Sequence, residues 1–200
     1  MSEKAKPARR RGGTRPVAPA RRRFSVDEYE RMLEIGILHE DEHIELLAGE
    51  IFEMSPIGSR HAARLSSLAT WLTVRLAGRA LVRVQCPIRL PTGSAPEPDL
   101  ALVRPRDDDY ETAHPGPEDV LLVVEVADTS LAYDRDLKLP RYAEAGIPEA
   151  WILDLPGSAV LVGREPSGGS YQSMTTLRRG DLLSPAAFPD LRLPVDQLLR

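Results

Sequence analysis

The sequence is poor in cysteine and in aromatic residues. Its 200 residues include one cysteine, Cys86, so no intrachain disulfide can form, and we assign this side chain no role beyond that of a small core residue. The four histidines show no zinc-ligand spacing with one another or with Cys86. Aromatic residues make up 5% of the chain, which disfavours a glycosidase that stacks sugars on aromatic rings.

Long apolar runs are also missing. No run approaches the roughly 18 residues that a membrane span needs, and the N-terminus lacks the apolar segment of a secretory signal. We therefore expect a cytoplasmic protein without a membrane anchor. The hydrophobic fraction of 42% and the length suit one compact domain with a substantial core.

Charge is distributed unevenly along the chain. Residues 1–23 hold nine Lys or Arg and one acidic residue, a net charge of +8. Because the whole chain has a net charge of -4, the remaining residues carry -12. The first 23 residues have no apolar periodicity, which predicts a disordered basic arm before a folded domain at 24–200. Such an arm attracts phosphates or serves only as a solubilising extension. The acidic body argues against a general nucleic-acid binder, yet clustered carboxylates suit metal-dependent phosphoryl transfer.

Local patterns predict an alternation of helices and strands. Ser25 and Glu28 have capping-box spacing, so we expect a helix from Ser25 to about Ile35. Helical spacing of apolar residues predicts a second helix over 59–76. The other expected elements are a hairpin over 44–54 that turns at Ala48 and Gly49, strands at 80–90, 98–103, 120–127 and 150–155, a surface loop at 104–118, a helix that ends at Gly146, and a strand pair over 158–177.

One acidic residue interrupts the apolar segment LLVVEVA. Alternation along a strand places Leu121, Val123, Glu125 and Ala127 on one side. Both sides of this strand are apolar, as in an interior strand covered by helices. Because an isolated buried carboxylate is costly unless it is paired or binds a metal, Glu125 is predicted to be a ligand or a catalytic group.

Two more acidic residues precede the strand predicted at 98–103. Pro98 has no N–H to donate, so we expect it at the first position of this strand. Asp99 then lies at the mouth of the strand, and Glu97, two positions earlier, points the same way. A simple turn is the alternative, because Pro and Asp are common in turns.

The segment YDRDLKLPRYAEAG holds a lysine that could approach these carboxylates. Pro140 cannot donate to the carbonyl four residues earlier, so the helix is expected to begin near Leu137 or to kink there. Lys138 then lies in the first turn after a loop of about ten residues, with Tyr142 on the same face. A solvated lysine is the alternative.

Two further residues have competing interpretations. Glu45 follows Ile44 in the predicted hairpin, where a surface position is the simpler interpretation. His61 lies at the start of the helix predicted at 59–76, where it could bind phosphate or serve as a local helix-start group.

Together these residues resemble the PD-(D/E)XK nuclease superfamily, and most closely a bacterial branch of restriction endonucleases long treated as a domain of unknown function. The matching segments are IELLAGEIFEM, the helix containing His61, EPDLALV, LLVVEVADTS and YDRDLKLPRYAEAGIPEAWILDL. The resemblance covers about residues 24–200. It implies an α/β fold with a restriction-endonuclease-like mixed sheet flanked by helices, and a site at one edge of the central strands.

One position departs from the superfamily pattern. The usual signature has a lysine two residues after the glutamate, where this chain has Ala127. In the branch that the chain resembles, the following helix supplies the amine, and Lys138 occupies the matching place. Ala127 is small enough to leave a gap for that side chain.

The resemblance implies a metal site. Asp99, Glu125 and the backbone carbonyl of Val126 would bind Mg²⁺, with waters completing the octahedron, and Mn²⁺ is the alternative ion. Lys138 would orient or deprotonate the attacking water, or stabilise charge on the phosphoryl oxygens.

Two more roles are implied around this metal site. Glu45 would hold a second metal or a metal-bound water, with Glu97 as the alternative residue. Tyr142 would position Lys138.

The leading hypothesis is therefore a Mg²⁺-dependent endonuclease that hydrolyses phosphodiester bonds, with DNA as the expected substrate. The alternative is a nuclease-like module that binds nucleic acid or a protein without cutting. Cutting both strands with one site per chain favours a homodimer, for which residues 158–177 are a candidate contact surface.

Overall fold

The fold is that of a computed structural model, which describes residues 20–200. The helical segments are α1 (Val26–Glu34), η1 (Glu40–Glu42), α2 (Ser59–Leu76), α3 (Leu131–Tyr133), η2 (Asp134–Lys138), α4 (Leu139–Glu144) and α5 (Val195–Leu198). The strands are β1 (Ile44–Leu47), β2 (Glu50–Glu53), β3 (Leu81–Val84), β4 (Leu100–Val103), β5 (Val120–Ala127), β6 (Glu149–Asp154), β7 (Ala159–Ser167), β8 (Ser170–Arg178), β9 (Leu182–Leu183) and β10 (Leu193–Pro194). The predicted basic arm at 1–23 lies almost wholly outside the described residues, and its boundary with the domain stays a prediction.

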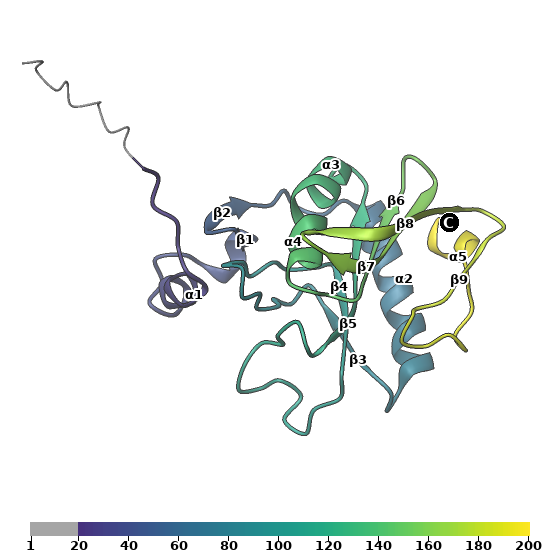
Figure 1. The fold of residues 1–200 in the computed structure, drawn as a ribbon, viewed down its shortest axis with the longest axis horizontal. Coiled ribbons are helices and arrows are strands. Elements are labelled where there is room, and N and C mark those ends of the chain that lie inside the picture. The colour runs from purple at the N-terminus through teal and green to yellow at the C-terminus, as the bar shows by residue number, and fades with distance from the viewer. Residues whose placement is uncertain (1–19) are drawn as a thin grey trace, which may run out of the picture.

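One mixed sheet forms the centre of the molecule (Figure 1). Its strand order is β3-β4-β5-β6-β7-β8, in which β5 and β6 are parallel and all other neighbours are antiparallel. Parallel neighbours need a long crossover connection, and here α3, η2 and α4 provide it. The predicted mixed sheet flanked by helices is confirmed.

Each face of the sheet has its own apolar core. On one face, Leu122, Val124 and Val126 of β5 pack with α2 and with the C-terminal segment. On the other face, Val123 and Ala127 pack with α4. Glu125 has the parity of this second pair, so its carboxylate points to the α4 side of the sheet.

The local signals at the N-terminal end of the domain are confirmed. Ser25 caps α1, with the reciprocal capping-box hydrogen bonds to Glu28. The β1–β2 hairpin turns at Ala48 and Gly49, whose φ angles of 50° and 79° are those of a tight type I′ turn. A side chain at Gly49 would also collide with Arg23, so glycine is required there.

The N-terminal elements form a small unit beside the main sheet (Figure 1). Val26 and Tyr29 of α1 pack against Ile44 and Leu46 of β1. Leu46 and Ala95 exchange two backbone hydrogen bonds of 2.8 and 3.3 Å, which tie this unit to the loop before β4. The position of β1 relative to the sheet is therefore fixed by backbone pairing as well as by packing.

Three sequence-based boundaries are wrong. The strand expected to start at Pro98 begins two residues later, at Leu100. The strand predicted at 80–90 ends at Val84, because Gln85 has a φ of 48° and leaves the extended conformation. The helical crossover begins at Leu131, so a helix start near Leu137 is wrong, and only Asp128, Thr129 and Ser130 separate the crossover from β5. The other option, a kink near Leu137, corresponds to the π-helical distortion of η2. The strand pair predicted over 158–177 is found as β7 and β8, while its use in a homodimer stays a prediction.

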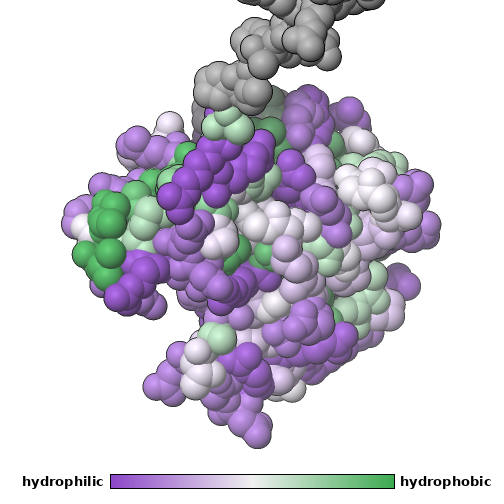
Figure 2. Space-filling model, turned by 60° about the vertical axis from the view of Figure 1, so that its left-hand side comes forward, coloured by the Kyte–Doolittle hydropathy of each residue, from purple (hydrophilic) through white to green (hydrophobic). Residues whose placement is uncertain are grey.

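One face of the molecule has a largely polar surface. The face shown in Figure 2 is mostly hydrophilic, and its apolar residues form small separate groups. No helix among residues 20–200 is long and apolar enough to cross a membrane.

A buried carboxylate, Glu149, joins three parts of the fold. Its Oε1 accepts hydrogen bonds from Trp151 Nε1 (2.9 Å) and Arg164 Nε (2.8 Å), and its Oε2 accepts one from the Ala186 N–H (2.6 Å). Glu149 is fully buried, so these donors replace water completely. This residue of the motif I-P-E-x-W is therefore structural.

We expect Glu149→Ala to lower the free energy of unfolding by about 3 kcal/mol, because three donors lose their acceptor. Urea denaturation measures this loss. Glu144→Ala is the matched control, since Glu144 is exposed and its ion pair with Arg141 contributes less than about 1 kcal/mol. Equal losses in the two variants would contradict this account of Glu149.

Candidate active site

A deep cleft of about 1050 Å³ opens where the N-terminal hairpin, the loop before β4, the end of β5 and the start of α2 meet. All four acidic or basic side chains singled out as catalytic line it. They are Glu45, Asp99, Glu125 and Lys138. The cleft thus brings together residues as far apart in the sequence as Glu45 and Lys138, which are separated by 93 positions.

Lys138 lies at the bottom of the cleft, with a side chain only 3% exposed. Its Nζ is 2.8 Å from Glu125 Oε1 and 3.3 Å from Glu45 Oε2, and it donates to the Glu97 carbonyl at 3.2 Å. An ammonium has three protons, and three acceptors surround this one. Burial alone would lower the pKa of Lys138, but Glu125 and Glu45 outweigh it and hold that pKa well above the ordinary value.

The backbone reaches this position through an unusual turn. Residues 134–138 form a π-helical segment, closed by a hydrogen bond from the Leu139 N–H to the Asp134 carbonyl. The widened segment stops just before Pro140, which has no N–H and whose ring would crowd the carbonyl four residues earlier. Lys138 is therefore about two turns inside a helical crossover, and its predicted place in the first turn of a helix is wrong.

Glu125 is buried beside this amine. Its Oε1 accepts a hydrogen bond from the Tyr142 hydroxyl (2.5 Å), and its Oε2 accepts one from the Asp99 N–H (3.3 Å). Burial raises the pKa of Glu125 to about 8, and the positive charge of Lys138 opposes that rise. Tyr142 thus contacts Glu125, although its expected partner was Lys138.

Asp99 is anchored through both carboxylate oxygens. Oδ2 accepts a hydrogen bond from the Val126 N–H (2.8 Å), and Oδ1 is hydrogen-bonded to His61 Nε2 (2.8 Å). The hydrogen bond to Asp99 raises the pKa of His61, although burial opposes this. In a strand the N–H and C=O of one residue point to the same side, so the Val126 carbonyl is expected on the side of β5 from which Asp99 approaches.

Glu45 is buried, so the surface position that the sequence favoured is wrong. Its side chain is 1% exposed. Oε1 accepts a hydrogen bond from the Tyr133 hydroxyl (2.8 Å), and Oε2 accepts one from the Glu97 N–H (2.9 Å) in addition to its contact with Lys138.

Two residues of the cleft, Tyr133 and Asp134, were missed, and His61, for which phosphate binding and a local helix-start role were both open, has a carboxylate partner. Tyr133 contacts Glu45, His61 contacts Asp99, and Asp134 is a buried carboxylate that accepts a hydrogen bond from Ser130 Oγ (2.6 Å). Burial raises the pKa of Asp134. The signal available in the sequence was the recurrence of Asp134, Lys138 and Tyr142 every four residues, which indicates one face of a continuous helix.

A family model described as "Putative restriction endonuclease", named Uma2, matches residues 26–196. The chain belongs to the Uma2 family. The resemblance to the bacterial restriction-endonuclease branch of the PD-(D/E)XK superfamily is thereby confirmed. Among curated proteins none is a significant match.

A crystal structure from Anabaena variabilis ATCC 29413, described as that of a "putative nuclease belonging to DUF820", has a similar fold. The TM-score is 0.67 at 15% sequence identity, and the likeness covers 88% of this chain and 97% of that chain. It shows that the sheet and its flanking helices are shared. The family and the fold support a nuclease.

The acidic residues of the Uma2 cleft fit a divalent cation. Seven acidic residues line the cleft, among them Glu45, Asp99, Glu125 and Asp134, and Lys138 lies between them. Within residues 20–200 no three His, Cys, Asp or Glu side chains form a ready metal cage. The predicted ligand set needs only two carboxylates and one carbonyl, which is typical of Mg²⁺, an ion that keeps several of its waters.

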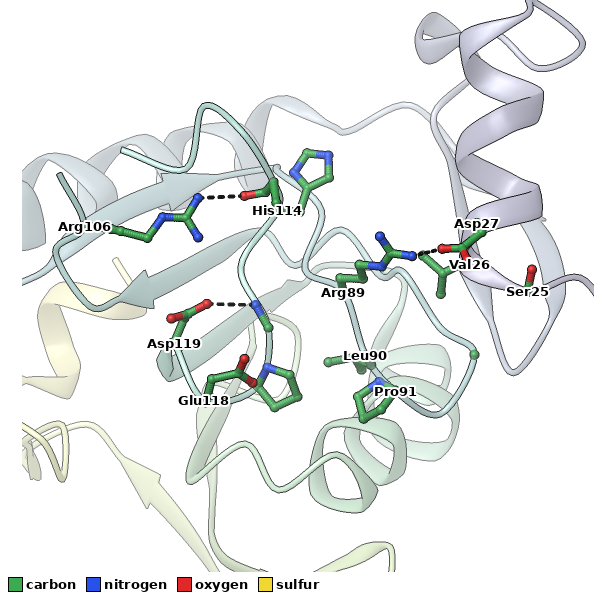
Figure 3. A pocket seen from close by; sticks show the side chains of 14 residues that line it. Ser25, Val26, Asp27, Arg89, Leu90, Pro91, Arg106, His114, Glu118 and Asp119 are labelled. Carbon is green, nitrogen blue, oxygen red and sulfur yellow. Dashed lines mark hydrogen bonds and ion pairs between the residues drawn. The ribbon is translucent and has the colours of Figure 1, made fainter. Parts of the chain in front are cut away.

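A second, more open groove of about 670 Å³ lies between the start of α1, the turn before β4 and the loop after β4. Figure 3 shows three interactions among its lining residues: Arg89 pairs with Asp27, Arg106 donates to the Ala113 carbonyl, and Asp119 accepts from Gly116. We therefore interpret these charged side chains as groups that hold the surrounding loops together. His114 lines both the groove and the cleft.

We expect Lys138→Met to lower the free energy of unfolding by about 3–5 kcal/mol, because Glu45 and Glu125 lose their buried cation. Denaturant titration at neutral pH measures the change. Arg141→Met is the control, since among residues 20–200 this accessible arginine pairs only with Glu144 and its removal costs less than about 1 kcal/mol. Loss of the same size in both variants would contradict the buried contacts of Lys138.

Proposed function

We propose that this Uma2 protein is a metal-dependent endonuclease that hydrolyses phosphodiester bonds in DNA. The observation that carries the proposal is the contact of Asp99, Glu125 and Lys138 around one cleft. Asp99 and Glu125 are linked through the Asp99 N–H, and Glu125 touches the amine. Two hard oxygen ligands beside a fixed positive charge are the groups that phosphoryl transfer requires.

We propose that Asp99, Glu125 and the Val126 carbonyl hold the ion, with Mg²⁺ as the expected species and Mn²⁺ as a substitute. When bound, the ion polarises the phosphate and lowers the pKa of a water molecule. Val126 supports Asp99 from the backbone, and Tyr142 supports Glu125 through its hydroxyl. These hydrogen bonds keep both carboxylates oriented toward the cleft.

Lys138 is assigned the role of a fixed cation. Its pKa is held well above the ordinary value, so it does not take a proton from water at neutral pH. A positive charge at this position orients the attacking water and stabilises charge that develops on the phosphoryl oxygens. Lys138 could orient the attacking water, deprotonate it or stabilise charge on the phosphoryl oxygens. The neighbouring carboxylates keep its amine protonated, which disfavours deprotonation of the water.

Glu45 is assigned the role of holding Lys138 in place. Three donors already contact its two oxygens, from Tyr133, Glu97 and Lys138. These contacts support a positioning role for Glu45, and the second metal ion implied by the family resemblance is the alternative role. Glu97 contributes through its backbone, since its N–H donates to Glu45 and its carbonyl accepts from Lys138.

Asp99→Asn, Glu125→Gln and Lys138→Met should each reduce the cleavage of plasmid DNA in Mg²⁺ by about 100-fold or more, because each removes a ligand or a charge next to the phosphate. Gel analysis of the rate of nicking measures the effect, and circular dichroism verifies the fold. Glu144→Gln, on the exposed side of α4, should cut like the parent. If the three cleft variants also cut at the parental rate, the proposed mechanism is wrong.

Metal uptake distinguishes this enzyme from a nuclease-like module that binds without cutting. Isothermal titration with Mn²⁺ should show one binding event for the parent, lost in Asp99→Asn and in Glu125→Gln. Lys138→Met should keep the event, because the amine is not a ligand and its charge opposes the cation. Binding that is unchanged by both carboxylate variants would favour the non-catalytic module.

A further inference from the structure

One segment of this acidic protein contains no acidic residue. Beyond residue 23 the chain carries a net -12, yet residues 54–96 hold neither Asp nor Glu. The same segment contains six arginines: Arg60, Arg64, Arg75, Arg79, Arg83 and Arg89. Arg60, Arg64 and Arg75 lie on α2 and Arg83 lies on the edge strand β3 beside it, whereas Arg79 and Arg89 lie in the connections and pair with carboxylates.

Three of these arginines occupy one flank of α2. Arg60, Arg64 and Arg75, with Trp71 between the last two, are separated by four, seven and four residues, which places them within about 60° of one another around the helix axis. The buried face, formed by Leu65, Leu68, Leu72 and Leu76, lies beside this flank. At 1.5 Å per residue, Arg60 and Arg75 are about 22 Å apart along the axis. We call Arg60, Arg64 and Arg75 the α2 arginine flank.

The α2 arginine flank begins at the rim of the cleft. Arg60 contacts Asp128, a residue that lines the cleft, at 3.2 Å and donates to the Leu155 carbonyl at 2.9 Å. His61, the next residue of α2, reaches Asp99 inside the cleft. A nucleic-acid strand bound along α2 would therefore lead directly to the predicted catalytic groups.

Two arginines of the flank have no carboxylate partner in the described part of the chain. Arg64 makes no hydrogen bond or ion pair with residues 20–200, and its Nε is enclosed without a partner. The guanidinium of Arg75 lies 5.3 Å from the centre of the Trp71 ring, which holds it along the helix without neutralising it. Arginines on other elements, such as Arg31, Arg135 and Arg141, do contact a carboxylate.

We propose that the α2 arginine flank binds the phosphodiester backbone of nucleic acid and guides it to the cleft. The chemistry is that of guanidinium groups that contact phosphate oxygens and release counterions. Elsewhere the net negative charge of the body repels a polyanion, so an acid-free helix is where such a ligand meets the least repulsion. The direction of the strand toward the cleft rests on the proposed nuclease function, whereas binding along α2 does not.

The test is binding of a labelled duplex DNA of about 20 base pairs and random sequence, followed by fluorescence anisotropy with the full chain. Chelator replaces divalent metal, so no cleavage occurs, and the NaCl concentration is varied. Relative to the parent, Arg64→Gln/Arg75→Gln should raise the Kd about tenfold or more at low salt. Its slope of log Kd against log salt should fall by about two, one for each lost phosphate contact.

The controls separate charge from structure. Arg141→Gln/Arg178→Gln removes two arginines from α4 and β8 and should leave both the Kd and the salt slope unchanged. Arg64→Lys/Arg75→Lys keeps the charges and should restore the salt slope even if its Kd differs. A duplex RNA of the same sequence should show the same loss of slope, since the contacts are to phosphates.

Two results would overturn the α2 arginine flank as a binding surface. One is absence of nucleic-acid binding by the parent protein. The other is a Kd and a salt slope in the Gln variant that match those of the parent. If the flank variant loses binding while the parent protein neither cuts DNA nor takes up Mn²⁺, the surface is supported and the proposed nuclease function fails.

Discussion

Lys138 places one positive charge between Glu125 of the central strand and Glu45 of the N-terminal hairpin, in a region from which water is almost wholly excluded. Charges in such surroundings are tolerated only when each has partners in good geometry. Here the partners come from three separate elements, β1, β5 and η2, and from the backbone of the loop before β4. The contact therefore fixes how these elements lie relative to one another.

The hydroxyl groups of Tyr133 and Tyr142 extend this arrangement on both sides. Each donates to one of the carboxylates that face Lys138. The result is a chain of alternating donors and acceptors across the bottom of the cleft, in which no member is left without a partner. Such a network orients its members because each side chain has one arrangement that satisfies its neighbours.

The sequence was sufficient for much of the fold, and for definite physical reasons. Ser25 and Glu28, the apolar spacing of 59–76 and the uniformly apolar β5 are local signals, and each produced the predicted element. Glu45 could not be placed in this way, because its burial results from a lysine 93 positions away. The start of the crossover helix was misplaced because Pro140 was taken as a helix boundary, whereas the wider π turn accommodates it within a continuous helical segment.

The position of the lysine on the crossover has a consequence for how the cleft responds to motion. A lysine on β5 would be held by the backbone ladder of the sheet, but Lys138 is held by side-chain contacts alone, which are its polar contacts at the bottom of the cleft and the packing of Leu139, Tyr142 and Ala143 against the sheet face. Side-chain packing loosens before the central strands separate. Warming or a small cavity under α4 would thus withdraw the amine while the strands that carry Asp99 and Glu125 stay intact, so loss of this charge would precede global melting.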